Sequence, residues 1–93
     1  MTAPDPIVTV TAYAVSCLPE GHPARRYYRL DVRRQGEHWV IEQGGEYLAL
    51  DGTWSTDPWP YETAESALAV AQFHAPRLTV DGRTTADILG GAR

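Results

Sequence analysis

The sequence predicts an α+β fold: an antiparallel β-meander of three to four strands, covered on one face by an α-helix and followed by a short strand and a short C-terminal helix. Several short segments alternate apolar and polar residues, which is typical of strands with one buried face. Glycine-containing turns separate these segments, and one longer stretch carries apolar residues at helical spacing. The chain has 93 residues and no shift in composition, so we expect a single domain over residues 1–93, with flexible tails at 1–6 and 90–93.

The first two strands are predicted from this alternation. Residues 7–15 are rich in β-branched side chains and alternate with period two, which predicts a strand. Residues 16–24 contain two prolines and a glycine, and we therefore expect a loop. Residues 27–33 alternate cleanly, which indicates a half-buried antiparallel strand. Its buried face is expected to carry Tyr28, Leu30 and Val32, and its solvent face Tyr27, Arg29, Asp31 and Arg33.

A β-hairpin is predicted around Gly44-Gly45, because two glycines readily take the positive φ angles of a two-residue turn. The segments on either side, 39–43 and 46–50, are rich in strand-forming residues. The register that follows pairs Gln43 with Glu46, Ile41 with Leu48 and Trp39 with Leu50.

A four-residue loop at 34–37 is expected to join this hairpin to the preceding strand. The register that this loop sets pairs Val32 with Trp39, Leu30 with Ile41 and Arg29 with Glu42. Both turns then place the large apolar side chains on one face, and this agreement favours the meander. On the outer face, the pairing of Arg29 with Glu42 predicts a cross-strand ion pair.

The second half of the chain predicts a helix packed on the sheet. An Asp51-Gly52 turn closes the third strand of the meander, and residues 53–61 are expected to be irregular. Thr63 is the expected N-cap of a helix that runs to about residue 75 and is stopped by Pro76. Small side chains along one side would let this helix lie close to the sheet. They form a stripe of Ala64, Ala67, Leu68, Ala71 and Ala75, with Val70 at its edge.

The end of the chain predicts a short strand and a short helix. Residues 77–80 resemble a strand that leads into an Asp81-Gly82 turn. Thr84 or Thr85 is expected to cap a helix that runs through Leu89 and is stopped by Gly90-Gly91.

The charge is distributed unevenly along the chain. The formal net charge is −4, and all eight basic residues are arginines. Five of these arginines and one aspartate fall within residues 25–34, so this stretch carries +4 and the remainder −8. The net charge argues against a protein whose whole surface binds nucleic acid, but it predicts an electrically two-sided molecule.

The sequence offers no motif for catalysis, cofactors or metal ions. The histidines at 22, 38 and 74 lack metal-site spacing, and Cys17 is expected to be a buried thiol. No glycine motif suited to phosphate opens a helix. We therefore expect a protein without enzymatic activity, cofactor or metal; the alternative is an enzyme whose site forms between subunits. With no apolar run long enough for a membrane, we also expect a cytoplasmic protein without membrane contact.

Aromatic residues provide the first candidate interaction surface. Trp and Tyr dominate binding hot spots, and several crowd a proline-containing loop. Phe73 falls on the helix side opposite the alanine stripe, which predicts a second layer formed by residues 77–89 or a dimer contact. The alternative is that these aromatics cover the open end of a thin core. The candidate partner-binding residues are Trp54, Trp59, Tyr61 and Phe73.

An open sheet edge provides a second route to association, because small domains often dimerise there or add a partner's strand. We therefore expect an accessory or regulatory protein that acts by binding another protein, as a homodimer.

The arginine stretch carries the alternative function of a nucleic-acid-binding module. Guanidinium groups and a tyrosine ring on the solvent side of a strand can bind phosphates and stack on bases. The other interpretation is a solvated or protein-facing strand. The residues concerned are Arg25, Arg26, Tyr27, Arg29, Arg33 and Arg34.

Residues 28–89 resemble small uncharacterised actinobacterial proteins that are often associated with mobile elements or phages. The resemblance rests on His38-Trp39-Val40, Leu48, Asp51-Gly52-Thr53-Trp54, Pro58, Ala67-Leu68-Ala69-Val70-Ala71, Ala75-Pro76 and residues 79–89. It implies a bacterial host and no particular activity.

A weaker likeness is to the N-terminal modules of tyrosine recombinases, in which a three-stranded sheet packs on a helix. It rests on Trp39, Gly44-Gly45 and residues 61–67. Those modules bind DNA with basic sheets, whereas this chain is acidic and has no lysine.

Overall fold

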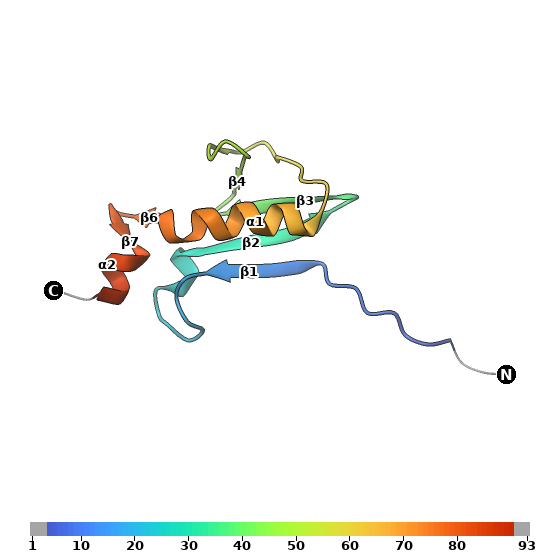
Figure 1. Ribbon diagram of the computed structural model, residues 1–93, viewed down its shortest axis with the longest axis horizontal. Helices are drawn as coiled ribbons and strands as arrows, with labels where there is room; N and C mark the ends of the chain where they lie inside the picture. The colour runs from blue at the N-terminus through green and yellow to red at the C-terminus, as the bar shows by residue number, and fades with distance from the viewer. Residues whose placement is uncertain (1–3, 91–93) are drawn as a thin grey trace.

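The computed structural model describes residues 4–90 and has the α+β architecture that the sequence predicts (Figure 1). The tails predicted at 1–6 and 90–93 extend beyond it, since 1–3 and 91–93 lie outside the described residues. The large sheet consists of β1 (Ala12–Ser16), β2 (Arg29–Gln35), β3 (His38–Gln43), β4 (Glu46–Leu48) and β5 (Trp54–Ser55). The other elements are α1 (Ala64–His74), β6 (Thr79–Val80), β7 (Arg83–Thr84), α2 (Thr85–Gly90) and 3₁₀ turns at Arg25–Tyr27 and Ala75–Arg77.

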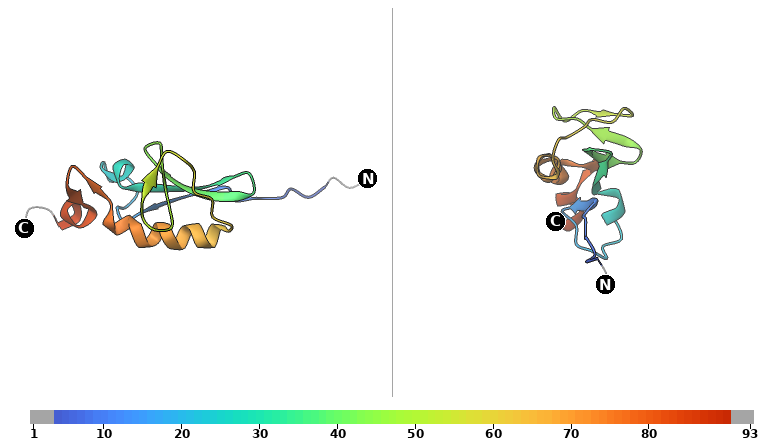
Figure 2. Two further views of the ribbon diagram at one scale, coloured as in Figure 1. Left: turned by 90° about the horizontal axis from the view of Figure 1, so that it is seen from above. Right: turned by 90° about the vertical axis from the view of Figure 1, so that its right-hand side faces the viewer.

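The large sheet is an antiparallel meander in the order β1-β2-β3-β4-β5, so each strand pairs with its neighbour in the sequence. Helix α1 lies across one face of this sheet, and within residues 4–90 no α-helix lies over the opposite face (Figure 2). The pair β6-β7 forms a small separate sheet beside α2 at one end of the molecule. The meander covered by one helix is thus confirmed, with β5 and β7 as strands that the sequence did not predict.

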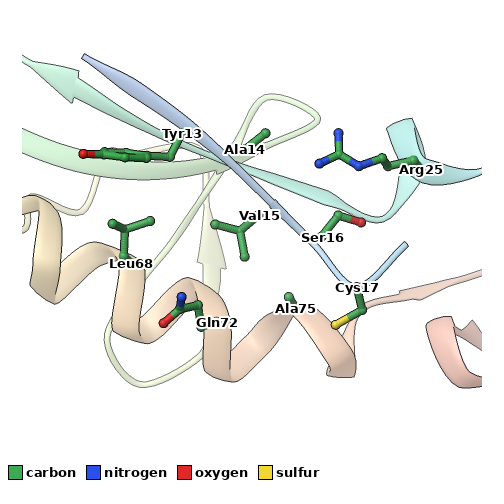
Figure 3. Close-up of a pocket in the computed structure, with 9 residues that line it drawn as sticks. All are labelled: Tyr13, Ala14, Val15, Ser16, Cys17, Arg25, Leu68, Gln72 and Ala75. Carbon is green, nitrogen blue, oxygen red and sulfur yellow. The ribbon is translucent and has the colours of Figure 1, made fainter. Parts of the chain in front are cut away.

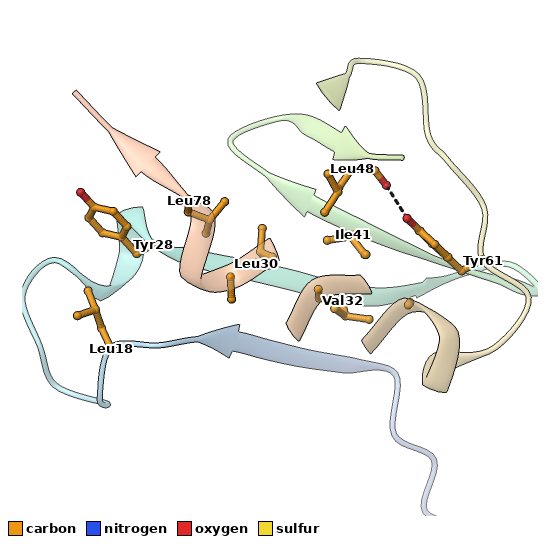
Figure 4. Close-up of a cluster of buried hydrophobic side chains, with 11 residues drawn as sticks. Leu18, Tyr28, Leu30, Val32, Ile41, Leu48, Tyr61 and Leu78 are labelled. Atoms are coloured by element: carbon orange, nitrogen blue, oxygen red, sulfur yellow. Dashed lines mark hydrogen bonds between the residues drawn. The ribbon is translucent and has the colours of Figure 1, made fainter. Parts of the chain in front are cut away.

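The hydrophobic core lies between the sheet and α1 (Figure 4). The predicted apolar face of β2 is confirmed, because Tyr28, Leu30 and Val32 are all buried. From α1, only alanines are fully buried, and their small side chains let the helix approach the sheet closely. The cluster consists of Leu18, Tyr28, Leu30, Val32, Ile41, Leu48, Tyr61, Ala67, Ala71, Ala75 and Leu78.

Strand β1 is shorter than the strand predicted at 7–15. It begins at Ala12, and its last backbone contact with β2 is the hydrogen bond from Arg34 N to Thr11 O, at 2.8 Å. The β2-β3 hairpin turns just beyond this point, so residues 7–10 have no strand beside them. The prediction is therefore wrong for residues 7–11, which belong to no strand within residues 4–90.

The predicted register between β2 and β3 is wrong by two residues. Val32 pairs with Ile41 instead of Trp39, because the connecting loop has two residues, Gly36 and Glu37, instead of four. Gly36 has a φ of 64°, which suits the first position of a type II′ turn. Since side chains alternate with period two, a shift of two residues leaves each one on the face that was predicted.

The hairpin at Gly44-Gly45 has the predicted turn, and Gln43 pairs with Glu46. Trp39 does not pair with Leu50, however. Strand β4 ends at Leu48, and Trp39 instead exchanges backbone hydrogen bonds with Tyr61, at 2.7 and 2.8 Å. The chain therefore returns to β3 at Tyr61, in the segment predicted to be irregular.

Helix α1 confirms the predicted start and end. The hydroxyl of Thr63 accepts a hydrogen bond from Ser66 N at 3.1 Å, and a 3₁₀ turn containing Pro76 follows the last residue of the helix. Thr84 caps α2, since its hydroxyl accepts from Asp87 N at 3.2 Å. The strand predicted at 77–80 is confined to β6, which pairs with β7 instead of joining the large sheet.

Candidate functional site

The four aromatic candidates do not form one surface. Tyr61 is buried and donates a hydrogen bond to Leu48 O at 3.1 Å, so it is a core residue and not an exposed anchor (Figure 4). Trp54 is partly buried against the core, as expected of an aromatic that covers a thin sheet. Trp59 is 44% exposed and Phe73 is 57% exposed. Residues 77–89 therefore do not form a layer that covers Phe73.

Burial raises the pKa of Tyr61 from its ordinary value of 10 to about 12, with a smaller contribution from the negative charge of Asp51. The folded state thus holds the phenol proton more tightly than the unfolded state does. The stabilisation from this difference is fully present below pH 10 and is lost as the pH rises through about 12.

We expect Tyr61→Phe to weaken the alkaline destabilisation of the protein. Urea titrations between pH 8 and pH 11.5 measure the free energy of unfolding of each variant, roughly the range over which an ordinary tyrosine ionises. The wild type should lose more stability than Tyr61→Phe over this range. Exposed Tyr27 provides the matched control, and Tyr27→Phe should follow the wild type. Parallel curves for wild type and Tyr61→Phe would show that burial does not shift this phenol.

Phe73 lines a groove of about 330 Å³ between α1 and the turn after β4. We call it the Phe73 groove; its walls are Leu50, Asp51, Ala69, Val70, Phe73 and His74. Leu50 is 63% exposed. Leu50 and Phe73 are the two large apolar side chains of the groove that are exposed to solvent. The three aromatics at 54–61 do not line the groove.

The turn at residues 49–53 is fixed against α1 by close contact and by its own hydrogen bonds. Gly52 has a φ of 90°, which favours glycine, and a Cβ atom placed on it would lie in tight contact with the His74 ring, 3.1 Å from Cε1. Asp51 Oδ1 accepts hydrogen bonds from the hydroxyl and the backbone N of Thr53, at 2.7 and 3.0 Å. These bonds lower the pKa of Asp51 below its ordinary value. One wall of the Phe73 groove is therefore held rigidly, with a carboxylate at its rim.

A positive charge lies over the Phe73 ring. The guanidinium of Arg77 stacks 3.9 Å from the centre of the Phe73 ring and donates a hydrogen bond to Phe73 O. The Phe73 groove thus combines exposed apolar side chains with a cation beside the aromatic ring.

The predicted arginine surface is divided between two elements. Arg29, Asp31 and Arg33 lie on the face of β2 away from α1, whereas residues 25–27 form a 3₁₀ turn before the strand. Arg29 pairs with Asp31 at 3.0 Å, and Arg33 with Glu42 at 3.2 Å, so the predicted Arg29–Glu42 ion pair is wrong. The two-residue shift in register causes this exchange of partners.

The other arginines of this surface also contact groups of the chain itself, and Arg33 has a second such contact. Arg33 donates to Glu42, which is the main reason that the pKa of Arg33 is raised, and it also donates to the Tyr47 hydroxyl. Arg26 donates to the Tyr27 hydroxyl at 2.7 Å and lies 4.7 Å from the centre of that ring. Arg25 donates to Leu18 O at 3.2 Å, and Arg34 to Gly36 O at 3.0 Å.

Cys17 is exposed, so the expectation of a buried thiol is wrong. It follows the last residue of β1, where the chain leaves the sheet. Across residues 4–90, no group of three or more His, Cys, Asp or Glu side chains is close enough together to bind a metal ion. Over the same residues, no helix has both the length and the apolar character needed to span a membrane.

Two further grooves are present. The larger, of about 470 Å³, runs between β1 and α1 along the open edge of the sheet (Figure 3). The other, of about 420 Å³, separates the 3₁₀ turn at Arg25–Tyr27 from the β6-β7 sheet and α2.

Sequence reasoning identified Phe73 but missed Leu50, which it placed opposite Trp39 in the sheet. No local pattern indicates its exposure, because this depends on the end of β4 at Leu48. Comparison of the chain with protein-family models, with curated proteins and with solved structures gives no match.

Proposed function

We propose that the chain is a small, non-enzymatic accessory or regulatory protein of the bacterial cytoplasm, which acts as a homodimer and binds another protein through the Phe73 groove. The observation that carries this proposal is that Leu50 and Phe73, both more than half exposed, line the same groove. Large apolar side chains that converge on one exposed hollow are typical of protein contact sites.

The cation over the Phe73 ring is the charge from which we infer the partner's chemistry. Arg77 covers one side of the Phe73 ring, so a carboxylate of the partner would meet a cation there. An apolar side chain beside that carboxylate would fill the hollow between Leu50 and Phe73. We therefore propose that the partner presents an apolar anchor next to an acidic residue.

The arginine surface supports the nucleic-acid alternative less well. Arg29 and Arg33 face carboxylates at 3.0 and 3.2 Å, and these carboxylates would have to be displaced or would repel phosphates. Two of the remaining arginines donate to backbone carbonyls. The positive stretch in the sequence is thus partly neutralised in the fold.

The test is retention from a lysate of the source organism on the immobilised protein, followed by measurement of the affinity of each retained polypeptide. We expect Phe73→Glu to weaken binding about 30-fold, which corresponds to the loss of roughly 2 kcal/mol at a hot spot. Trp59→Glu is the matched control, since it places the same charge on another exposed aromatic outside the groove. It should bind like the wild type.

Two results would overturn the proposal. If Trp59→Glu abolishes binding and Phe73→Glu does not, the contact lies elsewhere on the molecule. If the wild type retains nucleic acid in a steeply salt-dependent manner and an Arg25/Arg26/Arg33 triple alanine variant does not, the protein is a nucleic-acid-binding module.

A further inference from the structure

The segment before β1 is an exposed, strand-forming arm, which we define as residues 5–11. Ile7 and Val8 are 91% and 90% exposed, and Val10 is more than half exposed. The arm leaves β1 near the end of the β2-β3 hairpin and runs away from the body of the molecule (Figures 1 and 2). Apolar β-branched residues in an extended chain with unpaired backbone groups favour pairing with another strand.

The chain also contains an edge that can accept such a strand. β1 is the first strand of the sheet and has β2 on one side only. Beside its open edge, Val15 of β1 and Leu68 and Gln72 of α1 point toward the groove of about 470 Å³ (Figure 3). A strand added here would extend the sheet over this groove.

Hydrogen bonding fixes which backbone groups are free at this edge. Arg34 N donates to Thr11 O, so Thr11 and the alternate residues after it direct their backbone groups toward β2. The even-numbered residues therefore direct their N–H and C=O groups toward the open edge. In the arm and β1 these residues are Val8, Val10, Ala12, Ala14 and Ser16.

We infer that two copies of the chain pair antiparallel along this edge, with the arm of each copy beside β1 of the other and a two-fold axis at Thr11. This inference rests on the proposed homodimer and specifies its interface. The two large sheets then become one continuous sheet, with α1 of both copies on the same face. The register pairs Val10 with Ala12, Val8 with Ala14 and Ile7 with Val15 of the second copy.

The side chains of the arm and of β1 are complementary in this register. On the outer face, two valines of the arm lie opposite two alanines of β1, so large side chains meet small ones. On the helix face, Ile7 lies over Val15 and enters the groove beside Leu68. The pairing thus buries Ile7 in the groove and covers part of the surface of the two valines.

The ends of the pairing are also complementary. Pro6 falls opposite Ser16, and because proline has no N–H, the ladder ends there. Asp5 falls opposite Cys17, next to Arg25, whose side chain lines the same groove. Residues 6–19 carry no charge, so no like charges oppose each other between these ends.

A second copy is the occupant that this geometry selects. The arm runs on from β1 without a turn, so it cannot fold back on the edge of its own sheet. In a two-fold pair, the arm of each copy lies beside the β1 edge of the other, so both arms and both β1 edges have a partner strand.

The first test compares two proline variants by light scattering over a range of concentrations. Val10→Pro removes an N–H that donates to the second copy, whereas Thr9→Pro removes one that faces away from it. Both changes lie outside the strands, so the fold of the monomer should be unaffected. We expect Val10→Pro to shift the dimer dissociation constant upward at least tenfold and Thr9→Pro to shift it little.

The second test is disulfide cross-linking in a Cys17→Ser background. At the two-fold axis, Thr11 of one copy lies opposite Thr11 of the other in a non-hydrogen-bonded pair. The Cα atoms of these two residues are then about 4.5 Å apart, a separation that suits a disulfide. Thr11→Cys should therefore form a covalent dimer on oxidation. Val10→Cys is the control, because position 10 of one copy is offset along the strands from position 10 of the other. The distance between their Cα atoms therefore exceeds the roughly 7 Å limit for a disulfide.

The outcomes separate this inference from the proposed function. One outcome is that the wild type is a dimer, the Val10→Pro variant is also still a dimer, and Thr11→Cys cross-links no better than Val10→Cys. The arm pairing is then wrong, and the homodimer stands. If the wild type is a monomer at every concentration, both the pairing and the homodimer are wrong. Partner binding at the Phe73 groove is measured separately and depends on neither result.

Discussion

Leu30→Ala is expected to lower the free energy of unfolding by about 2–5 kcal/mol. Leu30 is completely buried in β2, and α1 packs directly over this strand. The substitution removes buried methyl groups and leaves a cavity that the surrounding sheet and helix can fill only partly. A domain of this size has a total stability of about 5–15 kcal/mol, so the loss is a large share of it.

Urea denaturation measures this change directly, with Leu50→Ala as the matched control. The side chain removed is the same, but Leu50 is mostly exposed, so its loss should change stability by about 0.5 kcal/mol or less. Equal effects of the two substitutions would contradict the position of the core between the sheet and α1.

The second large effect is expected for Tyr28→Ala, at about 3–5 kcal/mol. Tyr28 is buried, and its hydroxyl donates to Arg83 O at 2.8 Å, which connects β2 to the C-terminal unit of β6, β7 and α2. Removal of the ring should therefore weaken the core and also release this unit from the sheet. Amide hydrogen exchange over residues 79–90 should accelerate more than exchange in β3.

Two variants separate the contributions of Tyr28. Tyr28→Phe keeps the ring and loses only the hydrogen bond, so we expect a cost of about 0.5–1.5 kcal/mol. Tyr27→Ala removes a neighbouring ring that is half exposed, and should cost much less than Tyr28→Ala. Uniform acceleration of exchange throughout the protein would indicate that residues 79–90 unfold only with the whole domain.

The buried face of the sheet was predictable because alternation identifies it without any knowledge of the strand partners. Tyr28, Leu30 and Val32 are buried as predicted, although β2 begins and ends later than expected. The register was not predictable in the same way. A two-residue loop and a four-residue loop between β2 and β3 give registers that place the same side chains on the buried face. Which of the two forms depends on the conformation of Gly36.

The candidate site was only half predictable, for a related reason. Phe73 was identified by its position on α1, which is a local property of the helix. The exposure of Leu50 depends on where β4 ends and on the return of the chain to β3 at Tyr61. That return is a contact between residues distant in the sequence, and propensity and periodicity contain no information about it.

The meander also determines how the chain reaches its native state. From β2 to β5, each strand pairs with the one before it across a short connection, so little chain entropy is lost in closing each loop. Sheets with such local pairing fold faster than those built from distant strands. The hydrogen bond from Tyr28 to Arg83 spans 55 residues, the largest sequence separation among the side-chain hydrogen bonds of residues 4–90. We therefore expect the hairpins to form early and the unit of β6, β7 and α2 to dock last, so that a chain leaving the ribosome cannot complete this domain until residues 79–90 have emerged.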